Sequence, residues 1–536
     1  MKTITSSLLL SIVLICIGCQ VSPKQESEQL GVLNHSFVID QAAQPAFEKG
    51  LLLLHSFEYD DAKEAFQEAS TQDSTELMAY WGEAMSHYKA LWRLQDIDSG
   101  RAVMQKAGSN TEHRLEMADT ELEKDFWMGV EILYGDGELY TRNKDYAKHM
   151  AQLYEKYPGN QEVAAFYALG LMWTVEEGRD PEVFDLSAEI AKGILDENPQ
   201  HPGALHYLIH ANDDPAYAYR SITAANEYGQ LAPDATHALH MPSHIYLALG
   251  MWNEEVASNE ASYAASVKRM ERKGLDDKAR GYHSYAWLHY GYLQQGRFED
   301  ARQLLADMQT YTQNADTRAA KSYLIIMQNA QRVESGQWPD SLEPMYIDAD
   351  DLSIYSQVAQ HFNQALMAFD HKDTVHIQSI IDTVETKIAA AQLIAVDEGI
   401  SVCGAGPTRY KPSHAHIVRA QVMTQEIKAM IHVLKQQDDL AELYLRSATQ
   451  TEDESEYSYG PPDISYPSYE LYGEWLLSQN RAKEALVQFD RSLAIAPNRT
   501  RALKGKIHAL KQLDQLDEVK KIEAILSDFY QNTQAS

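Results

Sequence analysis

The sequence predicts an all-α solenoid made of antiparallel helix pairs, and three observations lead to this. From Phe47 onward, apolar residues recur with the spacing of amphipathic helices. Small residues, aromatics and prolines also recur at fixed offsets, with a period of about 34 residues. Hydrophobic residues form 44% of the chain, which is enough to build a core. Because a solenoid grows by adding units, 536 residues do not imply several globular domains.

The clearest unit lies near the C-terminus. In a tetratricopeptide repeat, small residues near the eighth and twentieth positions let two helices approach each other. An aromatic near the twenty-fourth position fills the gap, and a proline near the thirty-second ends the second helix. In LYGEWLLSQNRAKEALVQFDRSLAIAPNR these positions hold Gly473, Ala485, Phe489 and Pro497. The segment therefore predicts a tetratricopeptide-repeat (TPR) solenoid, a right-handed superhelix of helix pairs.

Other units follow the same template less closely. KGLLLLHSFEYDDAKEAFQEAS places Gly50, Ala62 and Phe66 at the expected positions. Weaker units end at Pro158, Pro199 and Pro233. Between about residues 310 and 450 the helical pattern continues with blurred repeat positions, which indicates degenerate repeats.

The N-terminal segment MKTITSSLLLSIVLICIGC has the features of an export signal. A basic residue, Lys2, precedes an apolar run from Leu8 to Ile17. Gly18 and Cys19, together with Ile17, resemble the lipobox of bacterial lipoproteins. This resemblance implies cleavage before Cys19 and lipidation of that cysteine, and hence a lipoprotein of the cell envelope, either periplasmic or anchored in the outer membrane.

Four segments are expected from these patterns. They are a signal peptide at 1–18, a lipidated flexible tether at 19–36, an N-terminal TPR solenoid with a histidine cluster at 37–310, and a C-terminal degenerate TPR solenoid at 311–536 that ends in a well-formed repeat. We expect contact with the membrane only through the lipid anchor.

The charge balance excludes one class of partner. Lys and Arg total 46 against 78 Asp and Glu, which gives a net charge of −32. Such a chain is repelled by phosphate backbones, so nucleic acid is not an expected partner.

Histidines are concentrated in two neighbouring repeats. Six of the 20 histidines lie between residues 201 and 244, where an even scatter would place about 1.6. Counting from Pro199 and Pro233, His206 and His210 fall on the fifth and ninth positions of one unit, and His240 and His244 on those of the next. Because residues four apart share one helix face, and these positions face the inner groove, the four imidazoles are expected to converge.

Four converging imidazoles predict a transition-metal site for Zn, Cu, Ni or Fe. The alternative for any one of these histidines is a peptide contact or a satisfied polar residue in the groove. Further ligands are suggested by sequence proximity or repeat register: His201, His237, His283, His289 and Glu176. Asp213 and Asp214 are candidates to orient the ligand rings from behind. Pro242 must break its helix near Met241, so His240 is expected close to a turn.

Aromatic residues form a second candidate feature. YWGEAMSHYKALW around residues 80–92 is dense in rings, and core packing between helices is the favoured interpretation. A ligand groove lined by Tyr88 and Trp92 is the alternative.

HPGALHYLIHA, LAPDATHALHMPSHIYLALGMW and the C-terminal repeat together resemble a family of secreted bacterial TPR proteins in which H-M-P-S-H recurs. The resemblance runs from about residue 40 to the C-terminus. It implies the fold and marks His240, Met241, Pro242, Ser243 and His244 as motif positions, but it implies no activity.

Three functions remain open at this point. The favoured one is a membrane-anchored scaffold that binds a protein or peptide in its concave groove and carries a histidine-based metal site. The second is a metal-dependent enzyme that uses the histidine cluster. The third is a surface lipoprotein that binds glycans or nutrients, which rests on fold and location alone.

Overall fold

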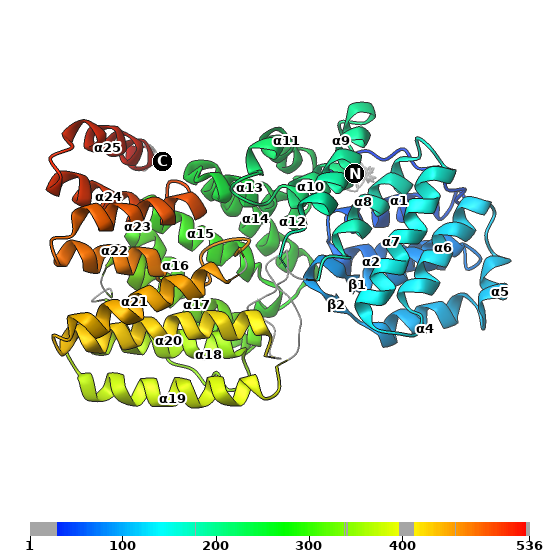
Figure 1. Cartoon of the computed structure of the whole chain (residues 1–536). Coiled ribbons are helices and arrows are strands. Elements are labelled where there is room, and N and C mark those ends of the chain that lie inside the picture. Colours follow the sequence, from blue (N-terminus) through cyan, green and yellow to red (C-terminus); the bar gives the residue numbers. More distant parts are fainter. Residues whose placement is uncertain are drawn as a thin grey trace, which may run out of the picture.

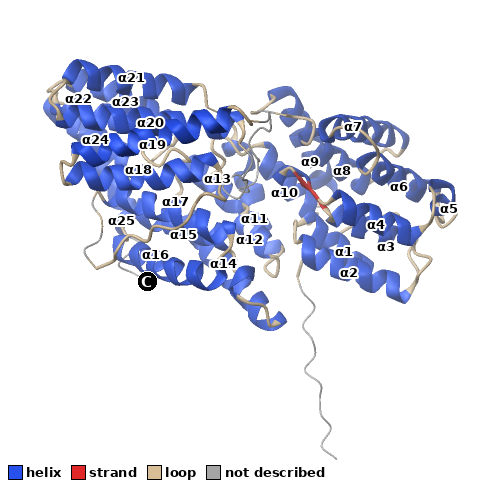
Figure 2. Ribbon diagram, turned by 90° about the horizontal axis from the view of Figure 1, so that it is seen from below, coloured by secondary structure: helices blue, strands red, loops and turns tan. Residues whose placement is uncertain are grey.

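A computed structural model describes residues 29–176, 178–336, 338, 341–395, 412–455 and 457–531. Over these residues the chain is an all-α solenoid of antiparallel helix pairs, as the sequence predicts (Figure 1). The described part contains one small sheet, an antiparallel hairpin of β1 (Tyr88–Lys89) and β2 (Leu94–Gln95) between α3 and α4 (Figure 2). No described helix is long and apolar enough to cross a membrane.

Helices α1 to α14 form the N-terminal part of the solenoid. They are α1 (Gln44–His55), α2 (Tyr59–Gln72), α3 (Leu77–Ser86), α4 (Ile97–Ala107), α5 (Thr111–Leu115), α6 (Glu121–Leu133), α7 (Leu139–Lys156), α8 (Gln161–Met172), α9 (Pro181–Glu197), α10 (Pro202–Ala211), α11 (Ile222–Leu231), α12 (Thr236–His240), α13 (Pro242–Leu249) and α14 (Trp252–Lys273). Short 3₁₀ turns lie at η1 (Ala90–Trp92), η2 (Ala218–Ser221) and η3 (Asp277–Ala279).

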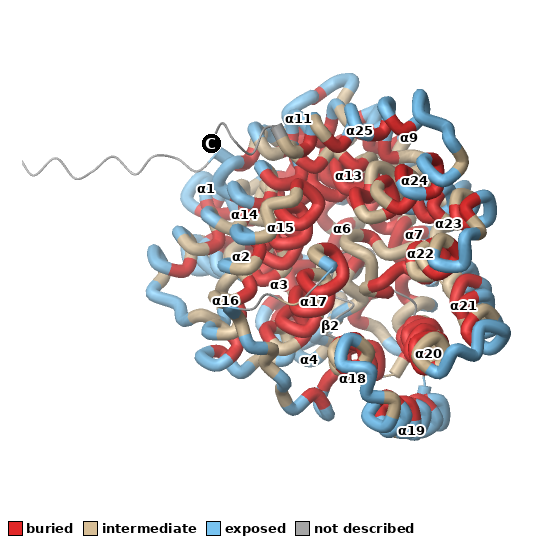
Figure 3. Tube along the Cα trace, turned by 90° about the vertical axis from the view of Figure 1, so that its left-hand side faces the viewer, coloured by how far each residue is buried: buried red, intermediate tan, exposed pale blue. Residues whose placement is uncertain are grey.

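Helices α15 to α25 form the C-terminal part. They are α15 (Tyr282–Gln294), α16 (Phe298–Ala315), α17 (Arg318–Ser335), α18 (Ile354–Asp370), α19 (Thr374–Gln392), α20 (His414–Leu434), α21 (Asp438–Asp453), α22 (Ser468–Ser478), α23 (Ala482–Ile495), α24 (Thr500–Gln512) and α25 (Leu516–Gln531). Buried residues gather in the interior between the helix layers, and exposed residues lie toward the rim (Figure 3).

Two phenylalanines explain why small residues recur in the repeats. The ring of Phe66, on α2, lies against Gly50 of its own pair and Gly82 of the next, and a Cβ added at Gly82 would lie 2.2 Å from the ring. Phe489 does the same between Gly473 and Gly505, where an added Cβ would lie 2.8 and 2.2 Å away, respectively. The spacing of glycine and phenylalanine thus sets how closely successive pairs stack.

The N-terminal pairs curve far enough for the first helix to reach the fifth pair. The end of α1 contacts α10, and the Nδ1 of His55 lies 2.8 Å from the Tyr207 hydroxyl across 152 residues of sequence. Helices α1 and α10 lie close together in Figures 1 and 2. This closure covers the inner face on which the predicted histidines sit.

The segment from residue 29 to 36, expected to be part of the flexible tether, is packed on the solenoid instead. Leu30 is buried, the Val32 N–H donates to the Gln200 carbonyl at 3.0 Å, and Asn198 Nδ2 donates back to the Val32 carbonyl at 3.0 Å. An apolar anchor and two hydrogen bonds to the Val32 backbone hold this segment in place, which its composition alone did not reveal. The expected signal peptide and Cys19 lie outside the described residues.

Candidate metal centre

Six histidines meet on the inner face, in two groups of three. One group is His206, His210 and His237, and the other is His240, His244 and His283. Within each group, one ligand atom per residue lies within 4.8 Å of the others. The four histidines predicted from repeat register are thus joined by His237 and His283, two of the additional candidates. We call these sets the first and the second histidine group.

The first group is built on α10 and the start of α12. His206 and His210 are one helical turn apart, and their Nε2 atoms are 3.0 Å apart. The His206 Nδ1 donates to the His55 carbonyl at 2.7 Å. A carbonyl only accepts, so the proton of neutral His206 is on Nδ1 and the lone pair of Nε2 faces the group.

The second group depends on the break at Pro242. Helix α12 ends at His240, and α13 begins with Pro242 at its first position, as expected for a proline that cannot continue a helix. His240 and His244 therefore sit on two short helices that meet at Met241, and His283 enters from the first turn of α15.

Hydrogen bonds behind the rings fix the tautomers of His240 and His244. The His240 Nδ1 lies 2.7 Å from Asn259 Oδ1, and Asn259 is oriented because its Nδ2 donates to the Glu255 carbonyl at 3.0 Å. The His244 Nδ1 lies 2.6 Å from the carboxylate of Asp213. Both Nδ1 atoms must donate, so in the neutral rings both Nε2 atoms carry lone pairs.

These two lone pairs point at each other. The Nε2 of His240 and the Nε2 of His244 are 3.2 Å apart. Two nitrogens bound to one zinc-like ion at about 2.0–2.1 Å and a tetrahedral angle lie about 3.3 Å apart. The spacing therefore suits a shared cation, and without one the two lone pairs would repel each other.

The two groups form one continuous patch. The rings of His237 and His240 are 6.1 Å apart between centroids, and those of His210 and His244 are 6.0 Å apart. One ion held by each group would therefore have the other as its immediate neighbour.

Burial keeps five of the six rings neutral. It lowers the pKa of His206 and of His283 to about 3, and together with neighbouring imidazoles it holds the pKa of His210, His237 and His240 well below the usual 6.5. Neutral imidazole is the form that binds a metal ion, so the rings need not lose a proton first.

The histidines were expected to face an inner groove, and in the structure this groove is closed over them. His206 and His210 have no exposed area, because the ring of Phe57 lies 4.2 Å from His206 where α1 folds back. Trp287 covers His240 and His244, with ring centroids 4.8 and 4.6 Å away. Trp287 is in turn covered by the loop at Gly460. These histidines are therefore unavailable as contacts for a peptide.

The histidine groups are reached through a cleft. His237 and His283 are partly exposed, and both line a cleft of about 1120 Å³. The same cleft is lined by the basic residues Lys63, Lys89, Arg269, Lys273, Lys278 and Arg280. We call it the cationic cleft. A small molecule in it would lie beside one histidine of each group.

His201 belongs to a third cluster, with His55 and Glu162, whose ligand atoms also lie within 4.8 Å of one another, but its hydrogen bonds leave no lone pair of His201 facing that cluster. It caps α10 by accepting the Ala204 N–H on Nδ1 at 3.2 Å, so its Nε2 carries the proton and faces Glu162 at 3.3 Å. The other Glu162 oxygen lies 2.8 Å from His55 Nε2. Burial alone would raise the pKa of Glu162, but His55 and His201 hold it well below 4.5. The three residues are a buried histidine–carboxylate–histidine network.

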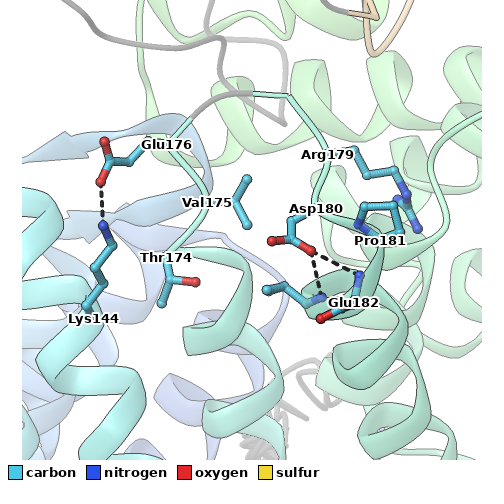
Figure 4. Close-up of a pocket in the computed structure, with 9 residues that line it drawn as sticks. Lys144, Thr174, Val175, Glu176, Arg179, Asp180, Pro181 and Glu182 are labelled. Atoms are coloured by element: carbon cyan, nitrogen blue, oxygen red, sulfur yellow. Dashed lines mark hydrogen bonds and ion pairs between the residues drawn. The ribbon is translucent and has the colours of Figure 1, made fainter.

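Three other candidates lie outside the two groups. His289 is buried elsewhere, with its Nε2 3.1 Å from Gln331 Oε1. Glu176 lies at a surface hollow and points to Lys144, with the two charged atoms 2.6 Å apart (Figure 4). Asp214 accepts the Ala216 N–H at 2.8 Å, whereas its neighbour Asp213 reaches His244.

Sequence reasoning did not find the hydrogen bonds from other parts of the fold that orient the histidines. Asn259 on α14 orients His240, and the His55 carbonyl at the end of α1 orients His206. Glu58 accepts the His237 N–H at 2.8 Å across 179 residues. No spacing rule connects these residues to the histidines, because each contact joins separate helices.

Comparison with known proteins shows neither a family nor a function for this chain. No protein-family model matches the chain, and no curated protein matches it. Among solved structures, Cut9 with Hcn1 from the APC/C is 12% identical, covers 90% of this chain and 79% of that chain, and has a TM-score of 0.34. Yeast Tom70 is 9% identical, with 89% and 90% covered and a TM-score of 0.31. The TPR domain of P58(IPK) is 11% identical, with 88% and 98% covered and a TM-score of 0.22. Conclusions about function therefore rest on the residues of this chain.

Proposed function

We propose that this protein is a metalloprotein in which the two histidine groups hold a two-ion transition-metal centre, with three imidazoles on each ion. The observation that carries the proposal is the 3.2 Å separation of the Nε2 atoms of His240 and His244, both of which present lone pairs. A shared proton is the other way to relieve their repulsion. It would create a buried imidazolium. Burial opposes this at His240, whose pKa it lowers, whereas at His244 the carboxylate of Asp213 would pair with the charge, so metal content decides between the two.

Three protein ligands leave a coordination position free on each ion, which is the arrangement of catalytic rather than structural sites. The cationic cleft reaches His237 and His283, so a substrate entering it could meet that position. The proposed role is therefore that of a metal-dependent enzyme acting on a small molecule. Imidazole ligands alone suit Zn, Cu, Ni or Fe.

A partner-binding scaffold is the second candidate, and it uses other surfaces. Val375 on α19 is 80% exposed and Leu443 on α21 is 57% exposed, and stacked repeats commonly present such faces to proteins. This function does not need the histidines. The proposal of a bound glycan or nutrient has no comparable observation in its favour among the described residues.

The proposed location is the cell envelope, with Cys19 as the lipid anchor. The support is the leader sequence and the Ile17-Gly18-Cys19 lipobox. Labelling cells with a radioactive fatty acid should mark the parent chain and leave Cys19→Ser unlabelled. Equal labelling of both chains would contradict the anchor.

Elemental analysis of the full chain, purified without a histidine tag, tests the metal centre. After reconstitution with each candidate ion and removal of excess, we expect about two ions per chain. The His240→Ala, His244→Ala double variant should lose at least one of them. His289→Ala, a buried histidine outside the groups, and His376→Ala, an exposed one, are the controls and should retain both. Absence of metal from the folded parent after reconstitution would overturn the proposal.

A further inference from the structure

The hairpin between α3 and α4 interrupts the repeat pattern and forms one wall of the cationic cleft. Lys89 ends β1, Trp92 ends the 3₁₀ turn, and Leu94 begins β2; all three line the cleft. Tyr88, the neighbour in sequence, instead points inward to Asn143 and is buried. The aromatic patch noted in the sequence is thus divided, with Tyr88 in the core and Trp92 at the cleft.

The charge of this cleft is opposite to that of the chain. Six basic side chains and three acidic ones, Asp60, Glu64 and Asp276, line it, in a protein whose net charge is −32. A cleft of one sign attracts ligands of the other sign by local field. The strongly negative remainder of the surface repels long anionic polymers, so a small anion fits this arrangement best.

Most of the basic groups in the cleft are already paired. Lys63 pairs with Asp60 at 3.3 Å, Lys273 pairs with Asp61 at 2.7 Å, and Arg269 also binds Asp61. Lys89 differs, because its ammonium stands over two aromatic rings, 5.6 Å from the centroid of Tyr59 and 5.4 Å from that of Trp92. No carboxylate among the described residues forms an ion pair with it. Its charge acts on Asp60 without a direct ion pair, so its ammonium can still receive a ligand carboxylate.

Trp92 links this lysine to the histidines. Its ring meets the ring of His237 edge-on at 5.9 Å, and it is only partly buried. Lys89 and His237 both border the Trp92 ring, so a flat apolar group against Trp92 would lie beside both.

We infer that the cationic cleft binds a small organic carboxylate with a flat apolar body, its carboxylate on Lys89 and its body against Trp92 beside His237. Its role as a substrate rests on the proposed metal centre. Its binding does not, because Lys89 and Trp92 hold it without a metal ion. The two proposals can therefore fail separately.

Benzoate titrated into the full chain by calorimetry, in chelator and after metal loading, tests this inference. We expect binding in both states and no comparable binding of uncharged benzamide. Lys89→Gln should weaken benzoate binding at least tenfold, whereas Lys63→Gln, on the same cleft but paired with Asp60, should change it less than twofold. Both variants should keep the parent helicity and metal content.

Equal affinity of Lys89→Gln and the parent for benzoate would overturn the inference, as would equal binding of benzamide and benzoate. Lack of benzoate binding to the folded parent would also overturn it. If benzoate binds the metal-free chain through Lys89 and the chain takes up no metal, the cleft assignment stands and the metal centre fails. Inorganic phosphate binding as tightly as benzoate would contradict the role of Trp92.

Discussion

The carboxylate of Asp213 lies 2.6 Å from Nδ1 of His244, and this contact decides which nitrogen of His244 faces His240. Both residues are buried. Asp213 follows α10, whereas His244 lies on α13, so a residue that follows the first histidine pair orients a member of the second. The two histidine pairs therefore occupy equivalent repeat positions and are also linked by the contact between Asp213 and His244.

Removing this support should weaken metal binding without removing a ligand. Asp213→Ala frees His244 to take the other tautomer, and loss of such an outer partner costs about 10–100-fold in metal affinity. Competition with a chromophoric chelator measures the change. Asp214→Ala, whose carboxylate turns to Ala216, is the matched control and should bind as the parent does. Unchanged affinity in Asp213→Ala would show that the ring does not depend on Asp213.

The number of ions should fall in steps. His206→Ala removes a ligand of the first group and His283→Ala removes one of the second, so each should retain about one ion and the double variant none. Elemental analysis with circular dichroism as a folding check measures this. If either single variant lost all metal, the six histidines would form one indivisible site rather than two.

The repeat packing makes a prediction about two glycines. A methyl group at Gly82 would lie 2.2 Å from Phe66, so Gly82→Ala should lower the free energy of unfolding by about 1–3 kcal/mol through overpacking. Gly193 in α9 is exposed, and an added Cβ there has no neighbour within 4 Å. Gly193→Ala should therefore stabilise the helix by about 0.5–1 kcal/mol. Urea unfolding of both, in chelator, gives the comparison, and a stable Gly82→Ala would contradict the packing account.

The repeat is the part of the fold that the sequence predicted best. Gly50 lies against Phe66 and Gly473 lies against Phe489, as the template requires. Both contacts lie within one helix pair. The return of α1 onto α10 could not be predicted. It depends on the summed curvature of several helix pairs, and no residue in α1 indicates that this helix packs on α10.

The histidine site was predicted in part for the same reason. His206, His210, His240 and His244 share repeat positions, and the structure brings them together. Glu176 has a corresponding position in the preceding unit but turns to Lys144 at the surface. The position of a residue in the repeat predicts which face of the helix it occupies. The contacts of its side chain depend on the residues of other helices that pack on that face.

A buried acid far from the histidines predicts a pH effect on stability. Glu426 on α20 has no exposed area, and neither carboxyl oxygen has a hydrogen-bond partner among the described residues. Burial, with the nearby charge of Glu452, raises its pKa well above 4.5. The folded chain therefore holds a proton that the unfolded chain releases, so stability falls as the pH rises above the unfolded value.

Glu426→Gln should remove this penalty. We expect its melting temperature to exceed that of the parent at pH 8, and the difference to shrink toward pH 5. Thermal unfolding at the two pH values measures it, beside Glu454→Gln, which changes an exposed carboxyl and should have no such trend. An increase in melting temperature that is the same at both pH values would rule out an effect of Glu426 titration.

The most direct test of the central claim is a crystal structure of the metal-loaded full chain with anomalous diffraction recorded at the absorption edge of the metal. The account predicts two anomalous peaks, one beside the Nε2 atoms of His240 and His244 and one within the first histidine group, with metal–nitrogen distances of about 2.0–2.1 Å if the ion is zinc. Peaks only at surface histidines, with the buried groups unchanged, would contradict it.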